Sequence, residues 1–200
     1  MTRRGPAAGF TLVELMVTVA MIGVLAVIAI PSVMEAMQKR EVVQASQAAL
    51  DLVEYARVQA AARNRAYAIR VAVASGGTAG GRIQLWENTT SSCFGFNAVG
   101  PGGETARMVR ELDLAASYPT VVLFEVQPQD LPNSPLCIKP DGRVFQVIND
   151  ATAVIIPSGD RFAGGDARLR FQRLNKVGRR EGPVHALAIP FNGLARVVVE

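Results

Sequence analysis

The side chains that most often carry out chemistry in proteins are scarce in this sequence. His185 is the only histidine, and Cys93 and Cys137 are the only cysteines among 200 residues. A zinc site made of Cys and His alone needs four ligands, so this chain cannot form one. Catalysis by a Ser–His or Cys–His pair would have to use His185, which lies in an alternating segment typical of a structural histidine. The sequence predicts no enzyme activity, no cofactor and no metal site.

One carboxylate is unusual because of its surroundings. Glu14 is the only charge between Phe10 and Met34, and the 20 residues from Leu15 to Met34 carry no charge at all. A run of that length can cross the hydrocarbon core of a bilayer as a helix. A carboxylate at the edge of such a segment costs about 2.5–3.5 kcal/mol on insertion scales and is a functional candidate by default. A plain membrane anchor explains the length of the run but not Glu14.

The residues that flank the apolar run indicate its topology. Arg3 and Arg4 precede it, and the positive-inside rule places that end in the cytoplasm. The rest of the chain is then expected in the periplasm, beyond the bacterial inner membrane. An ordinary secretory signal has a shorter apolar core followed by a small-residue cleavage site. The helical pattern here continues through Lys39 and Arg40, which argues against that alternative.

Residues 9–14, Gly-Phe-Thr-Leu-Val-Glu, resemble the processing site of type IV pilins and of the related pseudopilins of type II secretion. The resemblance implies that a prepilin peptidase cuts after Gly9 and then methylates the new amine of Phe10. It makes Glu14 the fifth residue of the mature chain, the position that the family uses in assembly. It also places Pro31 where pilins carry a helix-kinking proline.

An assembly role for Glu14 agrees with elementary electrostatics. Once a leader of residues 1–9 is removed, the new ammonium of Phe10 and the carboxylate of Glu14 both lie in or near lipid. Each charge is costly alone, and pairing the two lowers the cost. A pair formed between stacked subunits would also fix their axial register, which a helical filament requires. The alternative is that Glu14 simply extends toward the cytoplasmic interface.

The apolar run is predicted to begin a helix that continues to about Asn64. Pro31 removes one backbone donor and should kink this helix. Beyond Pro31, small and apolar residues recur at spacings of three and four, which predicts an amphipathic helix with a small-residue face that can approach a sheet closely. These residues are Val42, Ala45, Ala49, Leu52, Ala56 and Ala60.

The period changes from helical to alternating near residue 67. Strands are predicted at 67–73, 82–87, 107–114, 120–126, 143–148, 152–156, 167–174, 184–189 and 194–199. The predicted fold class is α+β and pilin-like, with a long N-terminal transmembrane helix packed on a C-terminal antiparallel β domain. The predicted domains are a leader peptide (1–9), a transmembrane and filament-core helix (10–34), its amphipathic continuation (35–66) and a β-rich globular domain (67–200).

Two segments, residues 137–145 and 188–197, each place an Asx-Gly turn between two strands. Together with residues 56–66 of the helix, they resemble the GspH/FimT group of minor pilins and pseudopilins. The resemblance implies a structural subunit in the tip or priming complex of a type IV pilus or a type II secretion pseudopilus. Implied partners are other minor and major pilins or pseudopilins, prepilin peptidase, the inner-membrane assembly platform and, before assembly, membrane lipid. Residues 88–118 match nothing in that group and are interpreted as a variable insertion.

The predicted topology also determines whether the two cysteines are expected to be oxidised. If the globular domain is periplasmic, Cys93 and Cys137 lie on the oxidising side of the membrane, where a disulfide between them is expected. Such a bridge would tie the 88–118 region to the sheet. The alternative is a pair of buried thiols.

The strongest concentration of charge lies between residues 161 and 180, a segment that contains seven cations and only one carboxylate, Asp166. In a strand, Arg168 and Arg170 share the face opposite Leu169 and Phe171. A cationic stripe of this kind suits DNA phosphates or anionic lipid headgroups. Because some FimT relatives are DNA receptors, a pilus-associated receptor for DNA uptake is the alternative function, and a solvated, salt-bridging face between subunits is the simpler interpretation. The seven cations are Arg161, Arg168, Arg170, Arg173, Lys176, Arg179 and Arg180.

Overall fold

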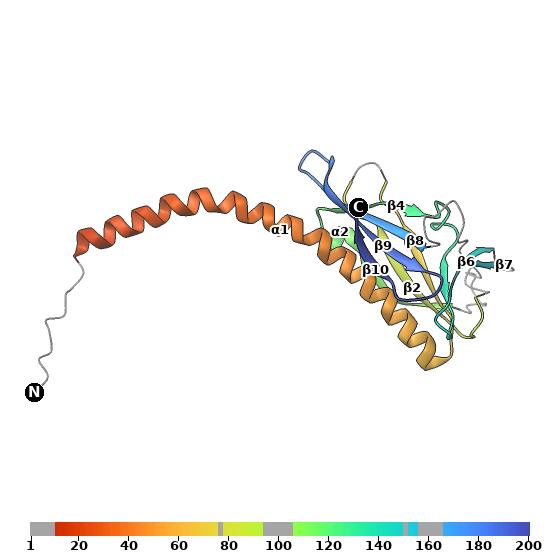
Figure 1. Ribbon diagram of the computed structural model, residues 1–200. Coiled ribbons are helices and arrows are strands. Elements are labelled where there is room, and N and C mark those ends of the chain that lie inside the picture. Colours follow the sequence, from red (N-terminus) through yellow and green to blue (C-terminus); the bar gives the residue numbers. More distant parts are fainter. Residues whose placement is uncertain (1–10, 76–77, 94–105, 150–151, 156–165) are drawn as a thin grey trace, which may run out of the picture. The chain divides into compact units, whose positions relative to one another are not determined.

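The structure is a computed structural model that describes residues 11–75, 78–93, 106–149, 152–155 and 166–200 (Figure 1). The chain divides into two compact units, Met1–Gln38 and Lys39–Glu200. Helix α1, Leu12–Arg63, begins in the first unit and ends in the second. The second unit contains the C-terminal part of this helix together with all of the strands.

Both ends of α1 follow from local sequence. Thr11 caps the N-terminus, because its hydroxyl oxygen accepts a hydrogen bond from the backbone N–H of Glu14 at 3.3 Å. At the other end Asn64 adopts a left-handed conformation, with φ of 51°. The N–H of Arg65 then bonds back to the carbonyl of Ala60, which satisfies one of the last free carbonyls of the helix. The predicted end near Asn64 is confirmed.

Two antiparallel sheets form the β part of the second unit. The six-stranded sheet has the order β3-β2-β1-β5-β6-β7, and the four-stranded sheet has the order β10-β9-β8-β4. The first contains β1 (Tyr67–Ala72), β2 (Arg82–Asn88), β3 (Ala106–Asp113), β5 (Leu136–Ile138), β6 (Val144–Asn149) and β7 (Thr152–Ile155). The second contains β4 (Val121–Gln127), β8 (Asp166–Leu174), β9 (Arg180–Pro190) and β10 (Arg196–Val199).

The connection between β1 and β2 links the two sheets. The N–H of Ala74 bonds to the carbonyl of Leu123, and the N–H of Leu123 bonds to the carbonyl of Gly80, so this connection runs beside β4. Gly81 makes the close approach feasible, because a Cβ added there would lie 2.7 Å from the Cβ of Leu123. Its φ of +114° also favours glycine.

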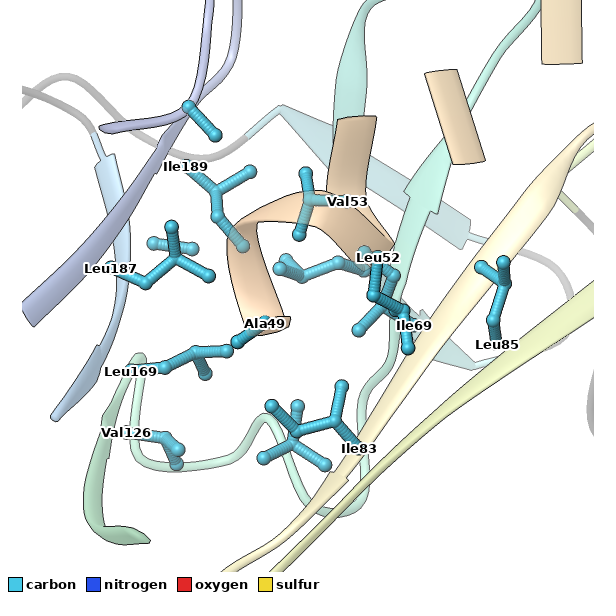
Figure 2. Close-up of a cluster of buried hydrophobic side chains, with 14 of the residues drawn as sticks. Ala49, Leu52, Val53, Ile69, Ile83, Leu85, Val126, Leu169, Leu187 and Ile189 are labelled. Atoms are coloured by element: carbon cyan, nitrogen blue, oxygen red, sulfur yellow. The ribbon is translucent and has the colours of Figure 1, made fainter. Parts of the chain in front are cut away.

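The main core lies between the C-terminal part of α1 and the two sheets. All six residues of the predicted small-residue face are buried, and Ala45, Ala49 and Ala56 are fully so. Figure 2 shows Ala49 between side chains of both sheets, with Ile69 on one side and Leu187 on the other. Alanines allow the helix backbone to approach the sheets closely, so the larger strand residues can fill the space around it.

The α+β class with antiparallel sheets is confirmed, and each predicted strand has an observed counterpart. Strand β5 was absent from the strands predicted by alternation, although the turn pattern of residues 137–145 placed a strand before the turn at 140–142. A one-turn helix α2 (Leu114–Ser117) was not predicted; Asp113 caps it, and the Asp113 carboxylate accepts a hydrogen bond from the N–H of Ala116. The predicted strand 107–114 was therefore one residue too long. Strand β9 begins at Arg180 rather than at 184, because Gly182 and Pro183 occupy a bulge where the pairing with β8 shifts register.

Candidate assembly site and basic strand

Glu14 lies in the first turn of α1, three residues after the capping Thr11. A carboxylate in that position interacts favourably with the positive end of the helix dipole. Among the residues that the structure describes, no cation forms an ion pair with it. Its predicted partner, the amine of Phe10, lies outside the described residues, as does the predicted cleavage position Gly9.

The helix that follows Glu14 carries apolar side chains on every side, and those that the structure describes between residues 12 and 27 are exposed. Large apolar side chains between residues 12 and 27 are 47–75% exposed, and they occupy consecutive as well as alternate positions. An apolar surface of this extent needs cover from lipid or from other protein chains. The exposed set comprises Leu12, Val13, Leu15, Met16, Val17, Val19, Met21, Ile22, Val24, Leu25 and Val27.

Within the described residues, no helix combines the length and the apolar character needed to cross a membrane. The transmembrane helix predicted over residues 10–34 is not confirmed. Pro31 lies inside α1, which is assigned as helix on both sides of it, and the predicted kink stays a prediction.

Cys93 and Cys137 form a disulfide, with an S–S distance of 2.03 Å and a Cα–Cα distance of 5.7 Å. The expected bridge is confirmed. Cys137 lies opposite Ala68 in the pairing of β5 with β1, on the sheet face away from Ile69. The two sulfurs belong to a second buried cluster with Ala66 and Val147, so the bridge fixes the segment after β2 to the outer face of the six-stranded sheet.

The sequence did not predict a cluster in which three arginines surround one buried carboxylate. The side chain of Glu87, at the end of β2, is 1% exposed and lies 3.1 Å from Arg63, 3.3 Å from Arg65 and 2.7 Å from Arg107. Burial alone would raise the pKa of Glu87, but hydrogen bonds from Arg107 and Arg63 outweigh it and lower that pKa to about 2. Burial, reinforced by the nearby Glu87 carboxylate, raises the pKa of Tyr67 to about 12. The cluster joins the end of α1 to strands β2 and β3.

Strand β8 has the predicted two faces. Leu169 and Phe171 are buried, and Arg168 and Arg170 are half-buried on the opposite face. These arginines are not an open stripe, because carboxylates from distant parts of the chain pair with them. Arg168 lies 2.6 Å from Glu200, and Arg170 lies 2.7 Å from Glu125 and 2.8 Å from Glu200.

The remaining predicted cations have different surroundings. Arg173 lies 3.0 Å from Glu181 across the β8–β9 pair. Lys176, Arg179 and Arg180 lie at or beside the turn between those strands, and Arg161 lies outside the described residues. The basic strand does form salt bridges, but with carboxylates of the same chain rather than of another subunit. Binding of DNA or lipid stays a prediction.

His185 lies within β9, where it is 8% exposed. Burial lowers its pKa below the usual 6.5, so the ring is neutral at pH 7. It lines a small cavity of about 270 Å³ with Val42 and Pro183. The surroundings are mostly apolar and are those of a packed side chain.

Residues 4–30 match the family model for the prokaryotic N-terminal methylation motif. This motif is a type IV prepilin-like signal, and it implies processing by prepilin peptidase and assembly with other pilins or pseudopilins. The chain therefore carries the N-terminal signal of type IV pilin-like proteins. No curated protein and no solved structure gave a significant match, and the GspH/FimT type is not confirmed.

Proposed function

We propose that this protein is a minor pilin or pseudopilin, a structural subunit in the tip or priming complex of a type IV pilus or a type II secretion pseudopilus. The observation that carries the proposal is the start of α1. A matched methylation motif, a capped helix with Glu14 in its first turn and an uncovered apolar surface over residues 12–27 occur together. The tip position rests on the resemblance of residues 137–145 and 188–197 to the GspH/FimT group.

In this proposal the precursor enters the inner membrane as a single-pass protein with its β domain in the periplasm. Peptidase removes residues 1–9 and methylates Phe10. The apolar part of α1 then leaves lipid and packs with the same segment of neighbouring subunits. Glu14 pairs with a neighbour's N-terminal ammonium in the filament core, where water is excluded and each charge needs a partner.

A pair of isosteric variants on one helix tests the assembly role. Glu14→Gln and Asp51→Asn each remove one exposed carboxylate from α1, but only Glu14 lies within the matched motif. We expect Glu14→Gln to be made and processed normally yet to be recovered in sheared filaments at least about tenfold less, whereas Asp51→Asn enters normally. Entry of Glu14→Gln at the level of the unchanged protein would remove the assembly role.

Deletion of the gene in its native host distinguishes the two machines. Lost or sparse pili with normal secretion would assign a type IV pilus, and stalled secretion with normal pili would assign a type II secretion pseudopilus. If both survive, the priming role is wrong.

The alternative predicted from the sequence, a receptor for DNA uptake, has less support. It needs free cations along β8, and Arg168, Arg170 and Arg173 are all paired with carboxylates. A labelled duplex added to the full chain tests it: salt-sensitive binding that Arg168→Glu together with Arg170→Glu abolishes would restore this alternative.

A further inference from the structure

The turn between β8 and β9 is an ordered, cationic projection of the four-stranded sheet. The side-chain oxygen of Asn175 accepts hydrogen bonds from the N–H groups of Val177, at 3.0 Å, and Arg179, at 2.9 Å. Gly178 supplies the left-handed residue, with φ of 76°. These two hydrogen bonds fix the backbone of the turn, and thereby the positions from which the neighbouring side chains extend.

Three cations at this tip lack a counter-charge. Lys176, Arg179 and Arg180 are exposed, and no carboxylate among the described residues lies within ion-pair distance of them. These three cations differ from Arg173 on the same pair of strands, because Arg173 is paired with Glu181. The whole chain carries a formal net charge of only +4, so three cations at one turn are a large local excess of positive charge.

The uncompensated arginines border a cavity of about 710 Å³. Val122 and Leu174 contribute apolar surface to it, and Phe124 lies beside Arg180, whose guanidinium carbon is 4.6 Å from the ring centroid. This stacking holds the Arg180 side chain at the edge of the cavity. A volume of this size is typical of binding pockets, and the lining offers both polar and apolar surface to an occupant.

We propose that this tip site, formed by Lys176, Arg179, Arg180 and Phe124, binds an acidic segment of a partner protein. Carboxylates of the segment pair with Arg179 and Arg180, and an apolar side chain enters the cavity beside Phe124. The neighbouring pair of Arg173 with Glu181 shows that a guanidinium on this surface accommodates a carboxylate. The inference stands on these contacts and does not depend on which filament the protein serves.

The same features favour a protein segment over a nucleic acid. Proteins that bind DNA commonly neutralise about 6–10 phosphates along a track, and this tip offers only three uncompensated cations. The arginines that could have extended the track along β8 are already paired with Glu125, Glu181 and Glu200. The apolar surface that Val122 and Leu174 contribute to the cavity suits an aliphatic side chain better than a phosphate group.

Fluorescence anisotropy on the full chain in an uncharged detergent tests the proposal. The probe is a short labelled peptide of glutamates with two leucines, compared with the same peptide carrying glutamine in place of glutamate. The site variant is Arg179→Gln with Arg180→Gln. The matched control is Arg82→Gln with Arg143→Gln, which removes the same charge from arginines in the β1–β2 and β5–β6 regions of the other sheet. Thermal unfolding confirms that each variant is folded.

We expect the acidic peptide to bind the unchanged protein and to weaken as salt rises, whereas the glutamine peptide does not bind. The site variant should lose about tenfold or more in affinity and the control less than about twofold. Phe124→Leu, which keeps every charge, should weaken binding severalfold. The proposal is overturned if the acidic peptide does not bind, if the site variant binds as well as the control, or if a DNA duplex binds this site and the peptide does not.

Discussion

The carboxylate of Glu87 lies 2.7 Å from the guanidinium of Arg107, directly across the pairing of β2 with β3. Arg63 and Arg65 approach the same carboxylate from the end of α1. One buried negative charge is thus shared by three partly exposed positive groups. Because α1 ends at this point, the cluster fixes the end of the helix to the six-stranded sheet.

Glu87→Gln should destabilise the domain in a pH-dependent manner. The pKa of Glu87 is lowered from 4.5 to about 2 in the folded protein, so its stabilisation is complete above about pH 4.5 and is lost as the pH falls through about 2. Water screens the half-exposed arginines, so we expect a loss of only about 1–2 kcal/mol at pH 7. Urea unfolding at pH 7 and pH 3 measures it. Glu111→Gln is the control, because Glu111 is more exposed than Glu87 and lies farther from its arginine, 3.6 Å from Arg82.

For Glu87→Gln the difference from the unchanged protein should shrink at pH 3, because there the unfolded chain, in which this carboxylate has its ordinary pKa of 4.5, binds a proton that the folded protein does not yet bind. Equal urea midpoints for the two proteins at pH 7 would show that the three arginines contribute nothing through this carboxylate.

Reduction of the disulfide between Cys93 and Cys137 should lower the free energy of unfolding. The bridge closes a loop across a sequence separation of 44 residues. The chain-entropy model then gives about 4 kcal/mol. Guanidinium unfolding of the oxidised protein, of the reduced protein and of a Cys93→Ser, Cys137→Ser variant measures the effect. Identical midpoints for the three samples would contradict a stabilising role for the bridge.

Arg57→Met should loosen the connection between β9 and β10. The side chain of Arg57 is 11% exposed, and its guanidinium donates to the carbonyl of Gly193 and, at 3.5 Å, to that of Pro190. Burial lowers the pKa of Arg57, while Glu54 opposes that shift. Loss of these hydrogen bonds should cost about 1–3 kcal/mol and speed amide exchange near residues 190–195. Val58→Met, at an exposed position of the same turn, should leave both measurements within error. Unchanged exchange in Arg57→Met would show that the arginine does not hold this connection.

The elements that could be predicted from the sequence are those in which buried apolar residues recur at a regular spacing. Leu169 and Phe171 are buried and Arg168 and Arg170 are not, so β8 alternates visibly along the chain. The buried alanines of α1 recur at helical spacing for the same reason. Strand β5 has three residues, all buried, and is too short to show any period, so only the turn pattern of residues 137–145 indicated a strand there.

The charge clusters could not be predicted, because their members are distant in sequence. Glu87 and Arg107 are separated by 20 residues and meet only through the register of β2 with β3. Arg170 and Glu125 are separated by 45 residues and meet through the register of β8 with β4. A count of charges between 161 and 180 therefore indicated a cationic stripe that forms salt bridges or binds an anionic ligand, but it could not name Glu125, Glu181 and Glu200 of the same chain as the partners.

Mass spectrometry of the N-terminus of the protein, isolated from its native host, tests the central claim most directly. The account predicts a mature chain that begins at Phe10, lacks residues 1–9 and carries one additional methyl group on its amine. Gly9→Asp should keep the leader, because a bulky charged side chain at the cleavage position blocks the peptidase. A chain that keeps residues 1–9, or one that is cut elsewhere, would contradict the assignment of a prepilin-like subunit.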